Sequence, residues 1–456
     1  MNPMPDLESL LDQVDAASDE IVSLSQKLVR IPTANTGVMP TGNETALCEF
    51  TRDWLAEDGI ECAILEAVPG RGNLIAKLEG RSGKAGLMLM SHSDVAPVED
   101  ESNWRFPPFS GTIAEGRIYG RGALDCKGTL TANLMAMRLL KQNGVELQDG
   151  LILASGADEA HGGRLGFKWL ADRHPDKITA PFALNEGCGT PISAAAGVAY
   201  ILGVGEKGRL QVEIDIRGES SLPGVPWQGD NALYRLAQVL ERIQAYEPER
   251  DTSLSLFSHL DTFGIERKPS CENIDQIIAE VKPRNLHLAK ILSFLSRMYL
   301  TPTMVRGGVK SNSIPESIQL TCDVRTLPHQ DEAYVRRQLH AVLEGLPGVS
   351  FEIDYMVVPN ASSFETKFLH CMKSATSLAF GRNDIQLVPG HSGGFTDSRF
   401  TRQLGVHTYG FTCLHPDDDP VLTHAHATDE SDSIRSLISR TKMMAALAYE
   451  MLAIKS

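Results

Sequence analysis

The sequence predicts an α/β protein that is interrupted by a separate α+β domain. Residues 1–204 and 359–456 contain short continuous apolar runs between helical patterns, which is typical of a mostly parallel sheet covered on both faces. In residues 205–358, apolar and polar residues alternate one by one, which indicates strands with one wet face. We therefore expect one α/β domain, built from both ends of the chain, around an inserted α+β domain.

The first part of the chain is expected to begin with helices. Apolar side chains at helical spacing run from Leu7 to Val29 and resume at residues 45–58. A further helix is expected at residues 128–142, where Asn143-Gly144 closes it. Strands are expected at the short apolar runs 73–78, 86–90 and 150–155.

The insert is expected to form its own sheet. Strict alternation marks residues 210–216 and 318–324 as strands, and amphipathic helices are expected at 231–243 and 333–343. The helices would cover one face of this sheet. The other face or edge would be free for water or a partner subunit.

Composition excludes several classes of protein. The chain has 58 acidic and 43 basic side chains and a net charge of −15, which disfavours a general nucleic-acid binder. The sequence contains no run of about 18 apolar residues, so no membrane span is expected. The first twenty residues lack a basic region followed by an apolar core, so no secretory signal is expected. Eight scattered cysteines without CxxC spacing indicate reduced thiols in a cytoplasmic protein.

Metal-ligating side chains recur directly after predicted strands or at polar turns. They are His92 and Asp94, Asp125, Glu159 and His161, Glu186, and His426. Each cluster alone is also explained by a hydrogen-bonded surface loop or a helix cap. Together they favour one crevice at the carboxyl edge of an α/β sheet. Neutral imidazoles and carboxylates suit zinc, manganese or cobalt better than calcium or magnesium.

With these motifs in order, the chain resembles the metallopeptidase family that includes acetylornithine deacetylase, succinyl-diaminopimelate desuccinylase, aminoacylase and glutamate carboxypeptidase. The resemblance covers nearly the whole chain. Its main motifs are His92-Ser-Asp94, Gly120-Arg-Gly-Ala-Leu-Asp125, Asp158-Glu159, Asn185-Glu186-Gly187, Thr396-Asp-Ser-Arg399 and His426-Ala-Thr-Asp-Glu430. The resemblance implies a zinc-exopeptidase-like catalytic domain with an inserted α+β, ferredoxin-like lid and dimerisation domain. A homodimer or higher homo-oligomer through this insert is then expected.

The resemblance also implies roles for the matched residues. The metal ligands would be His92, Asp125, Glu186 and His426. Asp125 would bridge two metal sites, with His92 at one and His426 at the other. Glu159 would be the general base that activates a water, and Asp94 would orient His92.

Two residues of the insert match lid positions that contact a substrate. They are Asn312 and Arg325, and the expected substrate is a small molecule with a carboxylate. A planar guanidinium suits a carboxylate because both of its donors can bind it at once.

The chain departs from the family pattern at the second metal site. The residue after Glu159 is usually acidic and ligates metal, but here it is Ala160. His161 would be a possible replacement ligand or a support to the ligands. Without it, Asp125 and His426 alone are too few for tight binding. We therefore expect one tightly bound divalent metal per chain.

A second departure lies in the insert, where Leu222 occupies the position at which the family usually has a histidine. That histidine helps to stabilise the oxyanion, and such a donor is commonly worth about 10²–10³ in rate. Three functions follow. The first is hydrolysis of an amide in an N-acyl amino acid or dipeptide. The second is a single-metal aminohydrolase that acts on a non-peptide amine, such as an aromatic one. The third is a degenerate homologue that binds without turnover.

Overall fold

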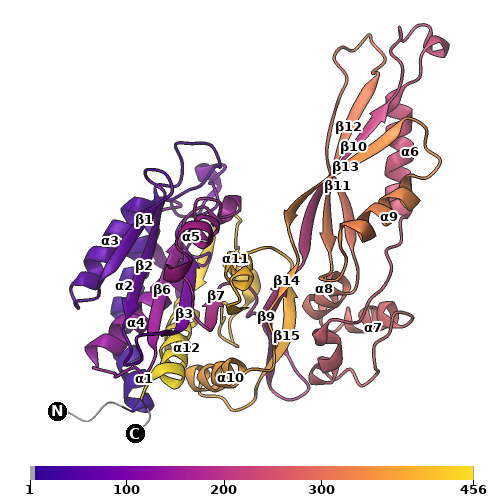
Figure 1. The fold of residues 1–456 in the computed structure, drawn as a ribbon. Coiled ribbons are helices and arrows are strands. Elements are labelled where there is room, and N and C mark those ends of the chain that lie inside the picture. The colour runs from indigo at the N-terminus through magenta and orange to yellow at the C-terminus, as the bar shows by residue number, and fades with distance from the viewer. Residues whose placement is uncertain (1–5, 455–456) are drawn as a thin grey trace.

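A computed structural model describes residues 6–454 of the protein, apart from the side chains of Tyr355 and Met356 (Figure 1). The expectation that no secretory signal is present bears partly on residues 1–5, which lie outside this range. In the part of the chain that is described, no helix is both long and apolar enough to cross a membrane. The α/β class with an inserted α+β domain is confirmed.

A ten-stranded sheet forms the larger part of the molecule, in the order β1-β2-β6-β3-β7-β16-β9-β14, with β15 and β8 also paired to β9. Its strands are β1 (Cys62–Glu66), β2 (Gly72–Leu78), β3 (Ala85–His92), β6 (Gly150–Gly156), β7 (Phe182–Asn185), β8 (Pro191–Ser193), β9 (Val198–Glu206), β14 (Asn360–Ala361), β15 (Ile385–Ser392) and β16 (His407–Gly410). The centre is parallel, because β3 runs parallel to β6 and β7, and β7 to β16. At one edge, β1 and β2 are antiparallel, because a short turn joins them directly.

Helices cover both faces of this sheet. They are α1 (Leu7–Ala16), α2 (Ser18–Val29), α3 (Glu44–Ala56), α4 (Lys127–Gln142), α5 (Phe167–Arg173), α10 (Lys367–Phe380), α11 (Ser398–Gln403) and α12 (Ile434–Leu452). In β3, Leu87 and Leu89 pack into the core under α4 and α12, while Met88 and Met90 pack into the core under α5. This two-sided burial explains the continuous apolar run. The first predicted helix is in fact two helices, α1 and α2, separated at Ala17.

A second sheet, which we call the lid sheet, has the order β11-β12-β10-β13. Its strands are β10 (Gly208–Arg217), β11 (Tyr299–Gly307), β12 (Ser317–Thr326) and β13 (Val349–Val357), and its helices are α6 (Ala232–Ala245) and α9 (Glu332–Leu343). The alternating apolar residues of β10 and β12 are buried against these helices, as predicted. The lid sheet extends away from the large sheet (Figure 1).

The segment between α6 and β11 packs differently from the rest of the insert. It holds a 3-10 helix η5 (Ser255–Phe263) and the helices α7 (Ile274–Val281) and α8 (Leu286–Leu295). Their apolar faces pack on the large sheet, against Ile192, Ile201 and Val388, rather than on the lid sheet. This segment therefore forms a wall next to β9 and β15 (Figure 1).

A small third sheet ties the C-terminal region to the segment before α4. Its strands are β4 (Thr112–Ala114), β5 (Arg117–Tyr119) and β17 (Ser431–Ser433). The remaining short 3-10 helices are η1 (Glu101–Asn103), η2 (Glu159–His161), η3 (Pro175–Lys177), η4 (Pro226–Gln228) and η6 (Pro420–Thr423). Pairing of β17 with β5 brings residues 426–430 beside Asp125.

Candidate metal centre

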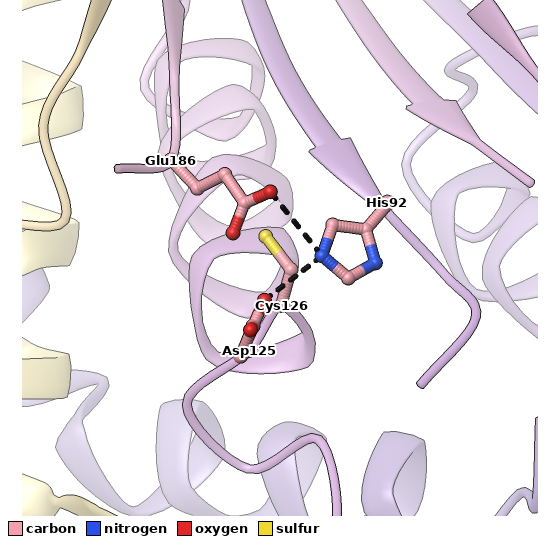
Figure 2. Close-up of side chains that lie close together, drawn as sticks. All are labelled: His92, Asp125, Cys126 and Glu186. Carbon is pink, nitrogen blue, oxygen red and sulfur yellow. Dashed lines mark hydrogen bonds and ion pairs between the residues drawn. The ribbon is translucent and has the colours of Figure 1, made fainter. Parts of the chain in front are cut away.

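Three segments that are far apart in the sequence meet at the carboxyl ends of the central strands. His92 ends β3, Glu186 follows β7, and Asp125 precedes α4. Because β3 and β7 are parallel neighbours, their ends reach the same edge of the sheet. The Nε2 atom of His92 lies 2.9 Å from Oδ1 of Asp125 and 3.3 Å from Oε1 of Glu186 (Figure 2).

Cys126 is a fourth member of this cluster. One possible ligand atom from each of His92, Asp125, Cys126 and Glu186 lies within 4.8 Å of all the others. The sequence alone favours a packing role for Cys126, because no CxxC spacing gives it a partner thiol. Its position next to Asp125 is the signal that could have identified it. Burial and the charge of Glu186 raise the pKa of this thiol well above its ordinary value, so sulfur is a weaker donor here than the two carboxylates.

His426 contacts the opposite side of Asp125. Its Nε2 atom lies 2.5 Å from Oδ2 of Asp125, and its side chain is 66% exposed. Asp125 thus lies between His92 and His426, which is the arrangement that a bridging carboxylate requires. All four predicted metal ligands are therefore brought together, His426 at the solvent side.

The charges of this cluster favour a cation. Burial alone would lower the pKa of His92, but the charge of Glu186 and the contact with Asp125 raise it well above its ordinary value. Burial and the charge of Asp125 raise the pKa of Glu186 to about 7. One imidazole nitrogen and two carboxylate oxygens that converge in a buried site fit a divalent transition metal.

Asp94 is completely buried behind His92. Its carboxylate accepts hydrogen bonds from the backbone N–H groups of Glu159 and Ala160, at 3.0 and 3.1 Å, and lies 3.5 Å from Nδ1 of His92. The Nδ1 atom itself is 2.9 Å from the backbone oxygen of Asp94. Asp94 therefore contacts the imidazole of His92 and also holds the turn that bears Glu159.

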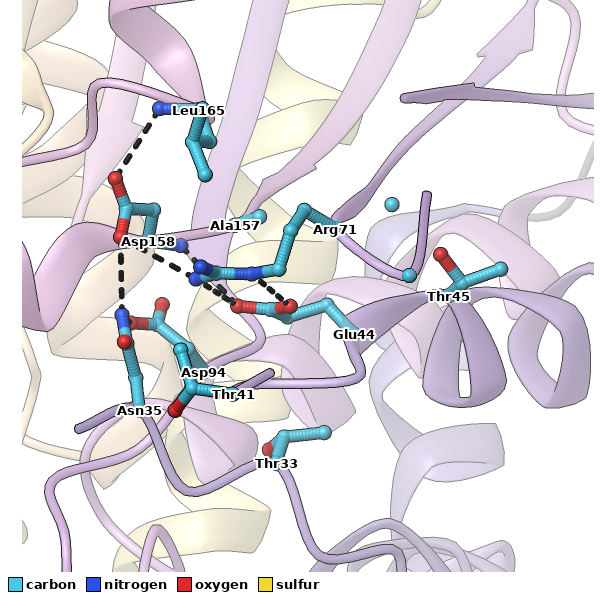
Figure 3. Close-up of polar contacts among 12 residues, drawn as sticks. Thr33, Asn35, Thr41, Glu44, Thr45, Arg71, Asp94, Ala157, Asp158 and Leu165 are labelled. Atoms are coloured by element: carbon cyan, nitrogen blue, oxygen red, sulfur yellow. Dashed lines mark hydrogen bonds and ion pairs between the residues drawn. The ribbon is translucent and has the colours of Figure 1, made fainter. Parts of the chain in front are cut away.

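A buried polar network continues behind Asp94 (Figure 3). Asn35 donates to Asp94 at 2.9 Å and to Asp158 at 3.1 Å. Arg71 binds Glu44 through two donors, both at 2.7 Å, and also contacts Asp158 at 3.3 Å. Because Asp158 precedes Glu159 in the chain, this network positions the same turn. Sequence analysis missed Arg71, Glu44 and Asn35, since no spacing in the sequence links them.

Glu159 begins the short helix η2 beside the cluster. Burial, together with the charges of Glu186 and Asp397, raises the pKa of its carboxyl group well above the ordinary value. His161 is exposed, and its ring lies against Gly37, where an added Cβ would come within 2.3 Å of the ring. His161 is not part of the four-residue cluster among the residues described.

Arg121 and Glu430 belong to motifs that the sequence analysis named, but their role in holding the Asp125 loop was not predicted. Glu430 is buried, and its carboxylate accepts hydrogen bonds from the backbone N–H groups of Leu124 and Asp125, at 3.2 and 3.1 Å. Arg121 neutralises Glu430 at 2.7 Å. Glu430 closes the motif that begins at His426, so one short segment both contacts and positions Asp125.

The two lid residues that were expected at the substrate lie far apart. Arg325 is near the large sheet, where its Nη1 atom donates to the backbone oxygen of Gly393 at 3.0 Å and its Nε atom to Asp323 at 2.6 Å. Asn312 is exposed in the loop at the opposite end of the β11–β12 hairpin. The paired residues from Arg325 to Ile318 span about 23 Å at about 3.3 Å per residue. One chain therefore does not bring Arg325 and Asn312 together.

Leu222 lies in the exposed loop after β10, with 65% of its surface accessible. It cannot donate a hydrogen bond, so it cannot replace the side chain of the expected histidine.

Comparison with known proteins identifies the family to which this chain belongs. The model of peptidase family M20/M25/M40 matches residues 88–450, which is well over half of the chain. A probable succinyl-diaminopimelate desuccinylase of Staphylococcus epidermidis is 27% identical over 348 residues, which cover 75% of this chain and 76% of the relative. The N-fatty-acyl-amino acid synthase/hydrolase PM20D1 of Xenopus tropicalis is 25% identical over 461 residues, which cover 95% of this chain and 85% of the relative.

A solved structure shares the fold. The M20 family metallo-carboxypeptidase of Sulfolobus solfataricus superposes with a TM-score of 0.69 at 20% sequence identity, over 94% of this chain and 98% of that chain. The match extends over both the large sheet and the lid sheet, because it leaves only 6% of this chain uncovered.

Proposed function

The chain belongs to peptidase family M20/M25/M40 and is a metal-dependent hydrolase of C–N bonds, and from this premise we propose that it cleaves an amide bond in a small carboxylate-bearing substrate. An N-acyl amino acid or a dipeptide is the expected substrate. The observation that carries this proposal is the meeting of His92, Asp125 and Glu186 beside the turn of Glu159. The relative that acts on N-fatty-acyl-amino acids supports the same class of substrate.

The residues of the cluster divide the chemistry between them. His92, Asp125 and Glu186 would hold a divalent metal, which would supply a Lewis acid for the scissile carbonyl and for the attacking water. Glu159 takes a proton from the water and delivers it to the leaving amine. Its raised pKa suits this role, because the carboxyl group must hold the proton between the two transfers.

We also propose one tightly bound metal per chain, either zinc, manganese or cobalt. His92, Asp125 and Glu186 give three protein ligands and leave a position open, which is the pattern of a catalytic zinc. Among the residues that the structure describes, His426 is the predicted ligand on the other side of Asp125, since Ala160 has no ligand atom and His161 lies against Gly37. A second metal there would bind weakly.

We propose that the protein forms a homodimer or a higher homo-oligomer through the inserted domain. Arg325 lies near its own large sheet and is proposed to bind the substrate carboxylate. Asn312 of the same chain lies at the other end of the lid sheet. We propose that Asn312 contacts the substrate of a neighbouring subunit, and that the domain boundaries are 1–204, 205–358 and 359–456.

We propose a cytoplasmic location on the basis of the thiols. No disulfide joins any of the eight cysteines among the residues that the structure describes. Such a pattern is usual where glutathione keeps thiols reduced. Cell fractionation tests this proposal directly.

Activity measurements test the proposed reaction. The apo-protein is loaded with zinc, manganese or cobalt and screened with N-acyl amino acids, dipeptides and aminobenzoates. We expect release of a carboxylic acid and an amine from the first two classes. Glu159→Gln should lower turnover by about 10²–10⁴ while the metal content stays unchanged. Glu99→Gln, an exposed control, should retain activity.

Ala160 and Leu222 favour a second candidate, a single-metal aminohydrolase that acts on an aromatic amine. An electron-poor ring can store charge without an oxyanion donor, which would explain the lost histidine. Ammonia released from an aminobenzoate, with all amides left intact, would support this reaction instead. Lack of turnover with every metal would indicate a non-catalytic homologue.

A further inference from the structure

A cavity of about 390 Å³ lies beside the metal centre, between α8 and the ends of β9 and β15. Its volume falls within the range of small-molecule sites. The cavity shares Cys188 and Ser392 with a narrow crevice that reaches Glu186. The shared residues place the cavity close to Glu186.

One face of α8 forms the outer wall. His287, Lys290, Ile291 and Phe294 line the cavity at the spacing i, i+3, i+4 and i+7, which puts them on one side of the helix. The opposite side is anchored in the core by Leu288, Ala289, Leu292 and Leu295. The wall is therefore held in a fixed orientation.

His391 lies on the inner side of the cavity. Its residue is only 9% exposed, and its ring has no hydrogen-bond partner in the described part of the chain. Burial, together with the charges of Arg402 and Lys207, lowers the pKa of His391 to about 4, so the ring is neutral near pH 7. Buried polar groups normally have partners, so an unpaired imidazole that faces a cavity is a candidate ligand contact.

The side chains that line the cavity are apolar on the inside, and one at the rim is cationic. Ile201, Ile291 and Phe294 supply the apolar surface, while Lys290 is exposed at the rim. No Asp or Glu is among the residues that line the cavity, although the whole chain carries a net charge of −15. This local absence of acidic groups favours a ligand with a negative charge.

The cavity also adjoins the lid. An added Cβ at Gly393 would come within 3.1 Å of the ring of Phe294, so the ring lies directly over this glycine. The backbone oxygen of Gly393 accepts the hydrogen bond from Arg325. The apolar wall is thus continuous with the residue proposed to bind the substrate carboxylate.

We propose that this cavity is a specificity subsite that binds a side group of the substrate with an apolar body and a carboxylate at its free end. This inference rests on the proposed function, because it assigns the cavity to the substrate of the same site. The apolar body contacts Ile291 and Phe294, the carboxylate contacts Lys290, and His391 provides a hydrogen bond at the inner end.

Probe binding tests the subsite without any turnover. The binding of 3-phenylpropionate and of the neutral 3-phenylpropan-1-ol to the zinc-loaded protein is measured by titration calorimetry. Ile291→Trp should fill the cavity and weaken both probes by about 10-fold or more, and Lys290→Met should weaken the acid alone by about 10-fold. Leu286→Trp and Lys282→Met are matched controls outside the cavity and should leave both affinities unchanged.

The outcomes separate the two proposals. Failure of both probes to bind, or equal effects of Ile291→Trp and Leu286→Trp, would overturn the subsite. An affinity for the acid that depends on zinc but not on Lys290 would place the probe at the metal and also overturn it. If the probes bind as expected but no amide is hydrolysed, the subsite stands and the proposed function fails.

Discussion

The backbone N–H of Glu159 donates a hydrogen bond to Oδ1 of Asp94 at 3.0 Å. The other oxygen of Asp94 accepts from the N–H of Ala160, and the same carboxylate lies 3.5 Å from Nδ1 of His92. One buried carboxylate thus supports both the proposed general base and a proposed metal ligand. If Glu159 and His92 have the proposed roles, a change at Asp94 should affect both metal binding and proton transfer.

Replacement of Asp94 by Asn should impair both functions. The amide nitrogen of Asn is a donor. It therefore cannot accept a hydrogen bond from one of the two backbone N–H groups that donate to the carboxylate of Asp94. We expect a loss of about 10–100-fold in both metal affinity and kcat. Metal titration and steady-state kinetics measure the two effects. Asp100→Asn, on an exposed turn, is the control, and a loss in kcat with unchanged metal affinity would contradict the coupling.

Arg71 should be important for stability, since it is 2% exposed and binds Glu44 and Asp158. Arg71→Met leaves two buried carboxylates without their cation, so we expect the free energy of unfolding to fall by about 3–5 kcal/mol. Urea unfolding measures this change. The double variant Arg71→Met with Glu44→Gln should be less destabilised than the sum of the two single variants. Additive effects would show that the pair is not coupled.

Much of the fold could be predicted because burial leaves a periodic signal. The apolar run of β3 is buried on both faces, and the alternating residues of β10 are buried on one, as their patterns predicted. The packing of α7 and α8 was not predicted. Helical periodicity shows that a face is apolar, but not which of two sheets it contacts.

The site could be predicted only where motifs follow strands. The residues that family resemblance assigned as ligands converge, since His92 and Glu186 follow neighbouring strands, and the family itself is confirmed. The supporting roles of Glu430 and Arg71 were not predicted, because each is distant in the sequence from the residue that it holds and only the folded structure brings them together. The catalytic roles stay predictions.

Protonation of His391 should lower stability in acid. Its pKa is about 4 in the folded protein, against an ordinary value of 6.5, because burial disfavours the charged ring. Between these values the unfolded chain binds a proton that the folded chain does not, so stability falls as pH drops from about 6.5 to about 4. The loss should approach about 3 kcal/mol at most. In urea unfolding at a series of pH values, His391→Asn should flatten this part of the profile. A wild-type slope in the variant would contradict the assignment.

Removal of the metal should show how many sites bind tightly. After exhaustive dialysis we expect one equivalent per chain by elemental analysis, because the side of Asp125 that faces His92 and Glu186 offers three ligands in the described part of the chain. A chelator should lower the melting temperature, since a ligand at about 100 times its Kd stabilises the folded state by about 2.7 kcal/mol. His92→Ala or Glu186→Ala should abolish both retention and this shift, whereas His426→Ala should not. The exposed His370→Ala is a neutral control. Two retained equivalents, of which one is lost in His426→Ala, would indicate a complete second site. His161 would then be the first candidate for its missing ligand.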